Sequence, residues 1–264
     1  MAKRKTTPAT KATGPVYTIR EALDKAEPRP VETDDPTQKK NYAERLSRHL
    51  ATCLANALRK YFKMILPTED GGGQESKSRS RRSLKKLDIN YSTVEMGLGL
   101  GVSIKTINFR DYSKKKQTFG RFTKNYSRND NELRAEATDY HLRQPYAVLV
   151  AVVFLPVESC DDGGRGKDAN NPSSFAEAVN YFRLRANRTS PMDDVELFER
   201  VFIGIYHHDG KERGNATFYD VMEHKPPRHR RPRLDEGIDF PTIIERIRAA
   251  YDDRNNPAPV YADD

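Results

Sequence analysis

An almost uninterrupted apolar run from Tyr146 to Leu155 limits the fold of this chain more than any other feature. Prolines stand directly before and after the run, at positions 145 and 156, so it has the length of one strand. A strand that lacks polar positions has to be buried on both faces, as in sheets that carry helices on both sides. The run therefore favours an α/β fold around a central sheet.

Periodicity assigns helices and strands to much of the remaining chain. Apolar residues recur at three- and four-residue intervals from about Gln38 to Phe62, which is the pattern of an amphipathic helix. The other predicted elements are strands at 86–92, 98–109, 200–206 and 216–221, and helices at 129–143, 174–184 and 241–251. This order predicts an α/β fold with a mixed central sheet flanked by helices.

The two ends of the chain lack this periodicity. Residues 1–35 carry lysine, threonine, proline and acidic residues, and we expect a flexible basic N-terminal arm there. A single domain is predicted over residues 36–255, followed by a polar C-terminal tail over 256–264. No apolar run reaches the roughly 18 residues of a membrane helix, so we expect no membrane partner and a cytoplasmic location.

The charge of the chain favours a polyanionic partner. Lysine and arginine number 46 against 38 acidic residues, which gives a net charge of +8. Two loops concentrate basic residues: Lys114, Lys115 and Lys116 in the first, and Arg228, Arg230 and Arg231 in the second. The second loop is too rich in proline for a helix, and we expect an extended arm along DNA phosphates. Such contacts add affinity without choosing a sequence.

An acidic residue and a lysine lie on two adjacent predicted strands. Asp88 belongs to the first strand, and Lys105 lies near the end of the apolar part of the second. The glycine-rich segment 97–101 between them is expected to form a flexible turn, which would bring the two side chains together. A carboxylate can hold a divalent metal ion, and an ammonium group can stabilise the charge that develops on a phosphodiester. The pair therefore predicts a metal-dependent nuclease.

Asp88 together with the Ser-Ile-Lys sequence at 103–105 resembles the PD-(D/E)xK nuclease core. The match is to the variant in which serine replaces the second acidic residue. In restriction endonucleases of the CCGG-reading group, a glutamate on the following helix supplies the lost carboxylate. The resemblance covers about residues 85–156, and it implies a restriction-endonuclease-like core in this α/β chain. Leu87 stands where the family motif has proline.

The resemblance also implies a role for each residue of the motif. Glu136 would supply the displaced carboxylate, with Glu132 one helical turn away as the alternative. Asp88 and Glu136 would then bind one or two Mg²⁺ ions. Lys105 would position the attacking water and stabilise the transition state, and Ser103 would line the metal site.

Arg110 and Asp111, which follow Lys105 in the sequence, resemble positions that contact DNA bases in the CCGG-reading group. In the CCGG-reading group, an arginine and an aspartate that follow the catalytic lysine contact guanine and cytosine. Arg110 and Asp111 occupy similar positions here, and their side chains have the donors and acceptors that such contacts need. The alternative is a loop in which the two residues form a salt bridge with each other.

A His-His-Asp sequence at 207–209 also invites a metal-site interpretation. Adjacent strand residues face opposite ways, so both imidazoles cannot easily share one ion. We therefore expect a turn that leads into Gly210.

Together these features predict a Mg²⁺-dependent endodeoxyribonuclease that acts on double-stranded DNA. It would be a type II restriction-like or phage-defence enzyme of the prokaryotic cytoplasm, associated with the nucleoid when bound to DNA. Symmetric cleavage of a duplex calls for a homodimer or a higher homo-oligomer. Two alternatives stay open: a non-catalytic DNA-binding subunit of a larger complex, and a repair nuclease that reads DNA structure. The intact aspartate, glutamate and lysine set argues against the first.

Overall fold

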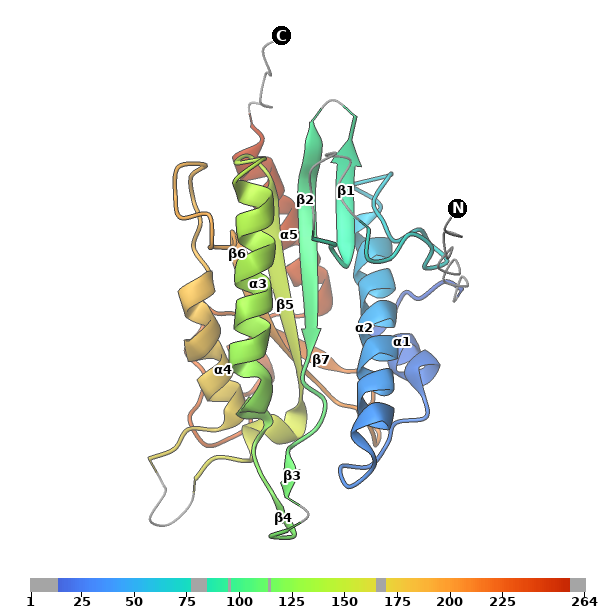
Figure 1. Ribbon diagram of the computed structural model, residues 1–264, viewed down its shortest axis with the longest axis vertical. Coiled ribbons are helices and arrows are strands. Elements are labelled where there is room, and N and C mark those ends of the chain that lie inside the picture. Colours follow the sequence, from blue (N-terminus) through green and yellow to red (C-terminus); the bar gives the residue numbers. More distant parts are fainter. Residues whose placement is uncertain (1–13, 77–84, 95, 114, 165–169, 257–264) are drawn as a thin grey trace, which may run out of the picture.

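A five-stranded mixed sheet forms the centre of the protein (Figure 1). The computed structural model describes residues 14–76, 85–94, 96–113, 115–164 and 170–256. The strands, in spatial order, are β1 (Ile89–Thr93), β2 (Gly97–Thr106), β5 (Val148–Pro156), β6 (Arg200–Tyr206) and β7 (Ala216–Asp220). The three central strands run parallel, and β1 and β7 pair antiparallel at the two edges. The predicted α/β fold with a mixed sheet is confirmed.

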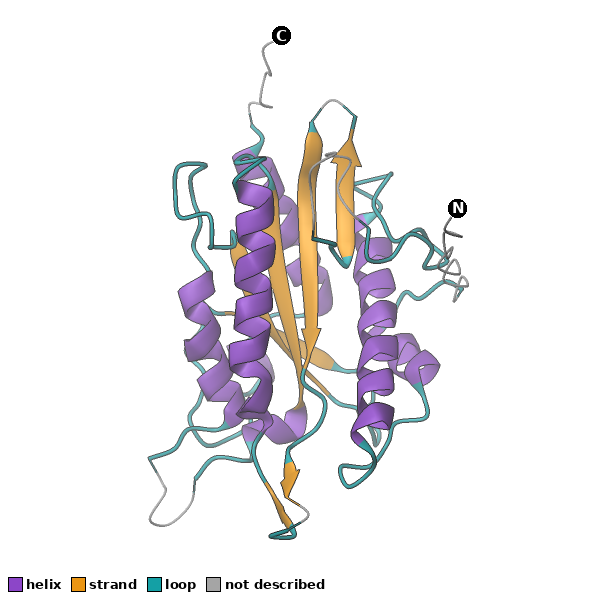
Figure 2. Cartoon of the chain, in the orientation of Figure 1, coloured by secondary structure: helices purple, strands orange, loops and turns teal. Residues whose placement is uncertain are grey.

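Helices cover both faces of this sheet, and Figure 2 shows the strands as one layer between them. One face carries α3 (Tyr126–His141) and α4 (Ser174–Phe182), and the other carries α1 (Ile19–Ala26), α2 (Pro36–Leu58) and α5 (Phe240–Arg254). Short 3₁₀ helices occupy Phe122–Asn125, Val157–Cys160, Arg183–Arg185 and Leu234–Glu236. No helix in the described ranges has the length and apolar character of a membrane span.

Strand β5 is buried along its whole length, as its sequence predicts. Its side chains alternate between the two cores: Val148, Val150, Val152 and Phe154 pack toward α1, α2 and α5, and Leu149, Ala151, Val153 and Leu155 pack toward α3 and α4. Each fully buried side chain of this kind contributes roughly 1.5–3 kcal/mol. A polar residue at any of these positions would lie in one of the two cores, which explains the unbroken apolar run.

The predicted flexible arm over residues 1–35 is wrong for its second half. Helix α1 begins at a capping box, in which the Thr18 hydroxyl accepts a hydrogen bond from the Glu21 amide at 3.1 Å. Its apolar face packs on α2 through Ile19, Ala22, Leu23 and Ala26, all of them buried. Eight residues make little more than two turns, which is too short for a clear periodic signal. Residues 1–13 and the tail from 257 lie outside the described residues.

The glycine-rich segment 97–101, predicted as a turn, instead forms the first half of β2. Only Gly97 takes the left-handed conformation of a turn, with φ of +68°. At Gly101 a Cβ atom would lie 2.6 Å from the Leu87 side chain and 2.7 Å from the Leu149 side chain. Glycine therefore serves close packing between strands here, because no larger residue fits between these two leucines.

Beyond β2 the chain forms a small hairpin of β3 (Tyr112–Ser113) and β4 (Thr118–Phe119), which projects at the bottom of Figure 1. The hairpin stands where the sequence predicts the basic loop of Lys114, Lys115 and Lys116. Lys115 and Lys116 are exposed near its tip, whereas Lys114 lies outside the described residues.

Candidate active site

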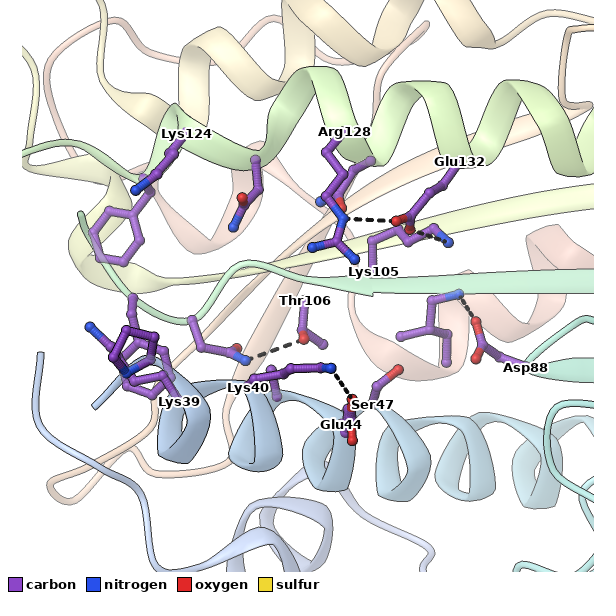
Figure 3. A pocket seen from close by; sticks show the side chains of 18 of the residues that line it. Lys39, Lys40, Glu44, Ser47, Asp88, Lys105, Thr106, Lys124, Arg128 and Glu132 are labelled. Atoms are coloured by element: carbon purple, nitrogen blue, oxygen red, sulfur yellow. Dashed lines mark hydrogen bonds and ion pairs between the residues drawn. The ribbon is translucent and has the colours of Figure 1, made fainter. Parts of the chain in front are cut away.

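A cleft of about 650 Å³ opens at the edge of the sheet, between α2 and α3 (Figure 3). It arises because β1 pairs with β2 only from Gly97 to Val102, so the last residues of β2 extend past the edge strand. Both helices contribute polar side chains to the walls: Lys39, Lys40, Glu44 and Ser47 from α2, and Arg128, Asn129, Glu132 and Glu136 from α3. Asp88 and Lys105 line the same cleft, so the fold brings the predicted acidic and basic residues to one place.

Asp88 lies directly before β1 and is partly buried. One of its carboxylate oxygens accepts a hydrogen bond from the backbone amide of Ile104 at 2.6 Å. Burial raises the pKa of Asp88 to about 7, against the lowering effect of Lys105 and of the Ile104 hydrogen bond. Repulsion from Glu136 raises this pKa further. The Asp88 carboxylate therefore lies where an added positive charge would be strongly favoured.

Lys105 is the link between the strands and α3. Its ammonium nitrogen lies 2.9 Å from a carboxylate oxygen of Glu136 and 3.3 Å from one of Glu132. Burial acts to lower the pKa of Lys105, but Glu136 and Asp88 outweigh burial, so the pKa is raised. A lysine in this state keeps its proton at neutral pH. It can stabilise developing negative charge but cannot serve as a general base.

The two glutamates on α3 both contact Lys105, but their surroundings differ. The Glu136 side chain is 12% exposed, and the Ser103 hydroxyl donates a hydrogen bond to it. The Glu132 side chain is 40% exposed and also forms an ion pair with Arg128 at 2.9 Å. Ser103 is buried behind Glu136, so it can orient that carboxylate but is not among the residues that line the cleft. Of the two glutamates, Glu136 is the more closely built into the cluster.

The donor set of this cluster suits a hard divalent cation. Asp88, Glu132 and Glu136 offer carboxylate oxygens, which are the ligands that Mg²⁺ prefers. The raised pKa of Asp88 and its repulsion by Glu136 are both effects that a bound cation would relieve. The residue types present therefore fit Mg²⁺, with Asp88 and Glu136 as the expected ligands, but the oxygens of the three carboxylates do not all lie within 4.8 Å of one another.

Arg110 and Asp111 line the cleft, but each pairs with a residue other than its neighbour. The Arg110 guanidinium pairs with both oxygens of Glu32, at 2.7 Å for the shortest contact, and lies over the Phe119 ring at 4.6 Å. Asp111 accepts a hydrogen bond from Lys124 at 2.6 Å. The alternative prediction, a salt bridge between Arg110 and Asp111, is therefore wrong. Base reading by these residues stays a prediction, and DNA would have to compete with Glu32.

The segment that contains Arg228, Arg230 and Arg231 is attached to the protein surface by its own arginines. Arg230 forms a two-point ion pair with Glu236 at 2.5 and 2.8 Å, which holds the pKa of Glu236 near 2. Arg231 pairs with Asp161 at 2.6 Å, and Arg228 donates to the carbonyl of Asn170 at 2.5 Å. The phosphate-contacting role of this segment stays a prediction, in which DNA phosphates would replace these carboxylates.

His207 and His208 face different partners, as expected for adjacent residues at a strand end. His207 lies 3.1 Å from Glu212, and His208 lies 3.2 Å from Glu158. The ligand atoms of Glu158, His208 and Asp209 lie within 4.8 Å of one another, a grouping that the sequence reasoning missed. Glu158 follows β5, fifty residues away in the chain, so no local spacing could reveal it. Burial acts to raise the pKa of Glu158, but the His208 hydrogen bond and the charge of Arg29 outweigh it and lower this pKa. The second carboxylate oxygen, Oε2, is buried and makes no hydrogen bond to the described residues.

No family model, curated protein or solved structure matches this chain. The likeness to PD-(D/E)xK nucleases therefore rests on the motif residues alone.

The contribution of α2 to the wall of the cleft was not predicted from the sequence. Its only signal was a polar face on the predicted helix, formed by Lys39, Lys40, Glu44 and Ser47.

Proposed function

We propose that the protein is a Mg²⁺-dependent endodeoxyribonuclease that hydrolyses phosphodiester bonds in double-stranded DNA. The observation that carries the proposal is the meeting of Asp88, Lys105 and Glu136 in one cleft, although they come from three separate parts of the chain. Carboxylates beside a charged lysine suit metal-assisted hydrolysis of a phosphate ester. The order of strand, strand, helix and buried strand agrees with a restriction-endonuclease-like core that has a displaced glutamate.

In this proposal each residue of the cleft has a separate role in catalysis. Bound Mg²⁺ would supply Lewis-acid activation of the phosphate and of a water molecule. Asp88 and Glu136 would hold the ion, and Ser103 orients Glu136 through its hydroxyl. Lys105, kept charged by its acidic neighbours, positions the water and stabilises the negative charge of the transition state.

The partners follow from the charge of the chain and the symmetry of the substrate. A net charge of +8 favours a polyanion, and basic residues border the cleft at Lys39, Lys40, Lys124 and Arg128. Cleavage of both strands of a duplex favours a homodimer or higher homo-oligomer. A type II restriction-like or phage-defence enzyme of the prokaryotic cytoplasm would have both properties, a DNA substrate and a homo-oligomeric assembly.

The direct test is incubation of purified protein with unmethylated phage DNA and Mg²⁺. We expect discrete fragments, with no cleavage when EDTA replaces Mg²⁺. A smear would indicate a nuclease that does not select a sequence. DNA binding by the wild-type protein without any cleavage would contradict the proposal and favour a non-catalytic DNA-binding subunit.

The two glutamates of α3 provide a matched pair of variants. Glu136→Gln should reduce the cleavage rate roughly 100-fold, because it removes a ligand and the orienting contact with Ser103. Glu132→Gln should reduce the rate by only a few-fold, because Glu132 is more exposed. Single-turnover rates at several Mg²⁺ concentrations measure both effects. The reverse order of the two losses would transfer the metal-binding role to Glu132.

A further inference from the structure

Asn129 is a buried polar residue on the wall of the cleft. Its side chain belongs to α3, the residue is 9% exposed, and it lines the cleft. Within the described part of the chain, its Nδ2 atom makes no hydrogen bond. Buried amide donors are nearly always paired, because leaving one unpaired after its removal from water is costly. Asn129 lines the cleft, so a rotation of its side chain would bring this buried, unpaired donor within reach of a ligand there.

The position of Asn129 along α3 separates it from the acidic cluster. It precedes Glu136 by seven residues, which is about two helical turns or roughly 10 Å along the helix. A phosphate that reacts beside Glu136 and Lys105 could not also reach Asn129 at this separation. The group that Asn129 contacts is thus a different part of the substrate.

The residues around Asn129 indicate an anion. Arg128 and Lys124 line the same part of the cleft wall, and Lys39 and Lys40 line the opposite wall. Arg128 and Lys124 are paired with Glu132 and Asp111, at 2.9 and 2.6 Å, so their charges are balanced within the protein. Among the described residues, Asn129 provides a donor that has no such partner. The start of the 3₁₀ helix before α3 is already capped, since the Phe122 amide donates to Asp162.

We propose that Asn129 donates a hydrogen bond to a phosphate adjacent to the scissile phosphate on the same DNA strand. Arg128 and Lys124 supply the positive charge of this subsite by exchanging their own carboxylates for the phosphate. The inference rests on the proposed nuclease function and specifies its substrate. The enzyme requires a phosphate on at least one side of the bond that it cleaves, so it acts on polynucleotides and not on simple phosphate diesters.

The binding test compares Asn129→Ala and Asn129→Asp with the wild-type protein on a short DNA duplex in EDTA. Asn129→Ala should weaken binding about tenfold, the effect of losing one hydrogen bond to a charged group. Asn129→Asp should weaken it more, because a carboxylate repels the phosphate. The slope of log K against log salt should stay unchanged for alanine, since no cation is lost. Asn131→Ala is the matched control, because Asn131 is exposed and lines a different hollow on α3.

Thermal unfolding separates a binding role from a structural one. Asn129→Ala should leave the melting temperature unchanged or higher, because the Nδ2 atom makes no hydrogen bond within the described protein. A melting temperature that falls in proportion to the loss of binding would overturn the inference. Binding and cleavage equal to those of the wild-type protein would also overturn it.

A duplex with one neutral methylphosphonate at successive positions identifies the phosphate. The wild-type protein should lose affinity at one phosphate beside the cleavage site, and Asn129→Ala should lose no further affinity there. Equal sensitivity of both proteins at every position would contradict the subsite. Failure of the nuclease proposal is seen separately, as a wild-type protein that binds DNA but does not cleave it with Mg²⁺. A wild-type protein that does not bind DNA would overturn both.

Discussion

Replacement of Lys105 by alanine should abolish cleavage while DNA binding stays nearly intact. The Lys105 ammonium pairs with Glu132 and Glu136 and also feels the charge of Asp88, so it lies where it can stabilise the charge of the transition state. Loss of one such group costs roughly 10²–10³-fold in rate. DNA affinity would depend instead on the many lysine and arginine side chains elsewhere on the protein. Single-turnover cleavage with Mg²⁺ and equilibrium binding in EDTA measure the two quantities separately.

Two further variants control for packing and for the removal of a charge. Lys105→Met keeps the apolar stem of this mostly buried side chain and should be as inactive as the alanine variant. Lys63→Ala removes an exposed lysine that does not line the cleft and should retain cleavage. Loss of folding together with binding in both Lys105 variants would make Lys105 a structural residue. Full cleavage activity in either Lys105 variant would show that Lys105 is not a catalytic residue.

Asp88→Asn should raise the stability of the metal-free protein at neutral and alkaline pH while it abolishes Mg²⁺-dependent cleavage. Burial raises the pKa of Asp88 to about 7 in the folded protein, against roughly 3.9 in an unfolded chain. Between these pH values the folded protein binds more protons than the unfolded one. Its stability therefore falls as pH rises from about 4 to 7 and stays low above that range. Asparagine does not ionise, and its side-chain oxygen can still accept the Ile104 hydrogen bond.

The expected gain from Asp88→Asn depends on pH in a defined way. It should be absent near pH 4 and reach about 2–4 kcal/mol above pH 7, measured by denaturant unfolding in EDTA. Added Mg²⁺ should stabilise the wild-type protein but not the variant, because only the wild type retains the ligand. A variant that is less stable than the wild type at pH 8 would show that the Asp88 charge is already compensated in the fold. Equal stabilisation of both proteins by Mg²⁺ would exclude Asp88 as a ligand.

Local patterns determined the central elements of this fold. The apolar run that became β5 has no polar position, so burial on both faces was its only stable arrangement. The α2 helix has enough turns for its apolar face to stand out from the sequence. Helix α1 did not show in the same way because it has only eight residues. The glycines of β2 were taken for a turn because close packing against Leu87 and Leu149 leaves no trace in sequence spacing.

The candidate site also has features that the sequence predicts and features that only the tertiary structure shows. The residue types and order of Asp88, Ser103, Lys105 and Glu136 could be read from the chain, and so could the uncertainty between Glu136 and Glu132. Their ion pairs and burial, and the pKa of Asp88 that results, required the packing of α3 against the end of β2.

Other contacts join residues so far apart that no local pattern reveals them. The pair of Arg110 with Glu32 spans 78 positions in the chain, and the unpaired Asn129 amide depends on which groups surround it. Sequence by itself therefore determined the secondary structure of the longer elements and the chemistry of the motif. The tertiary structure decided which charges meet, because the pKa of a group and the availability of a donor depend on neighbours from other elements.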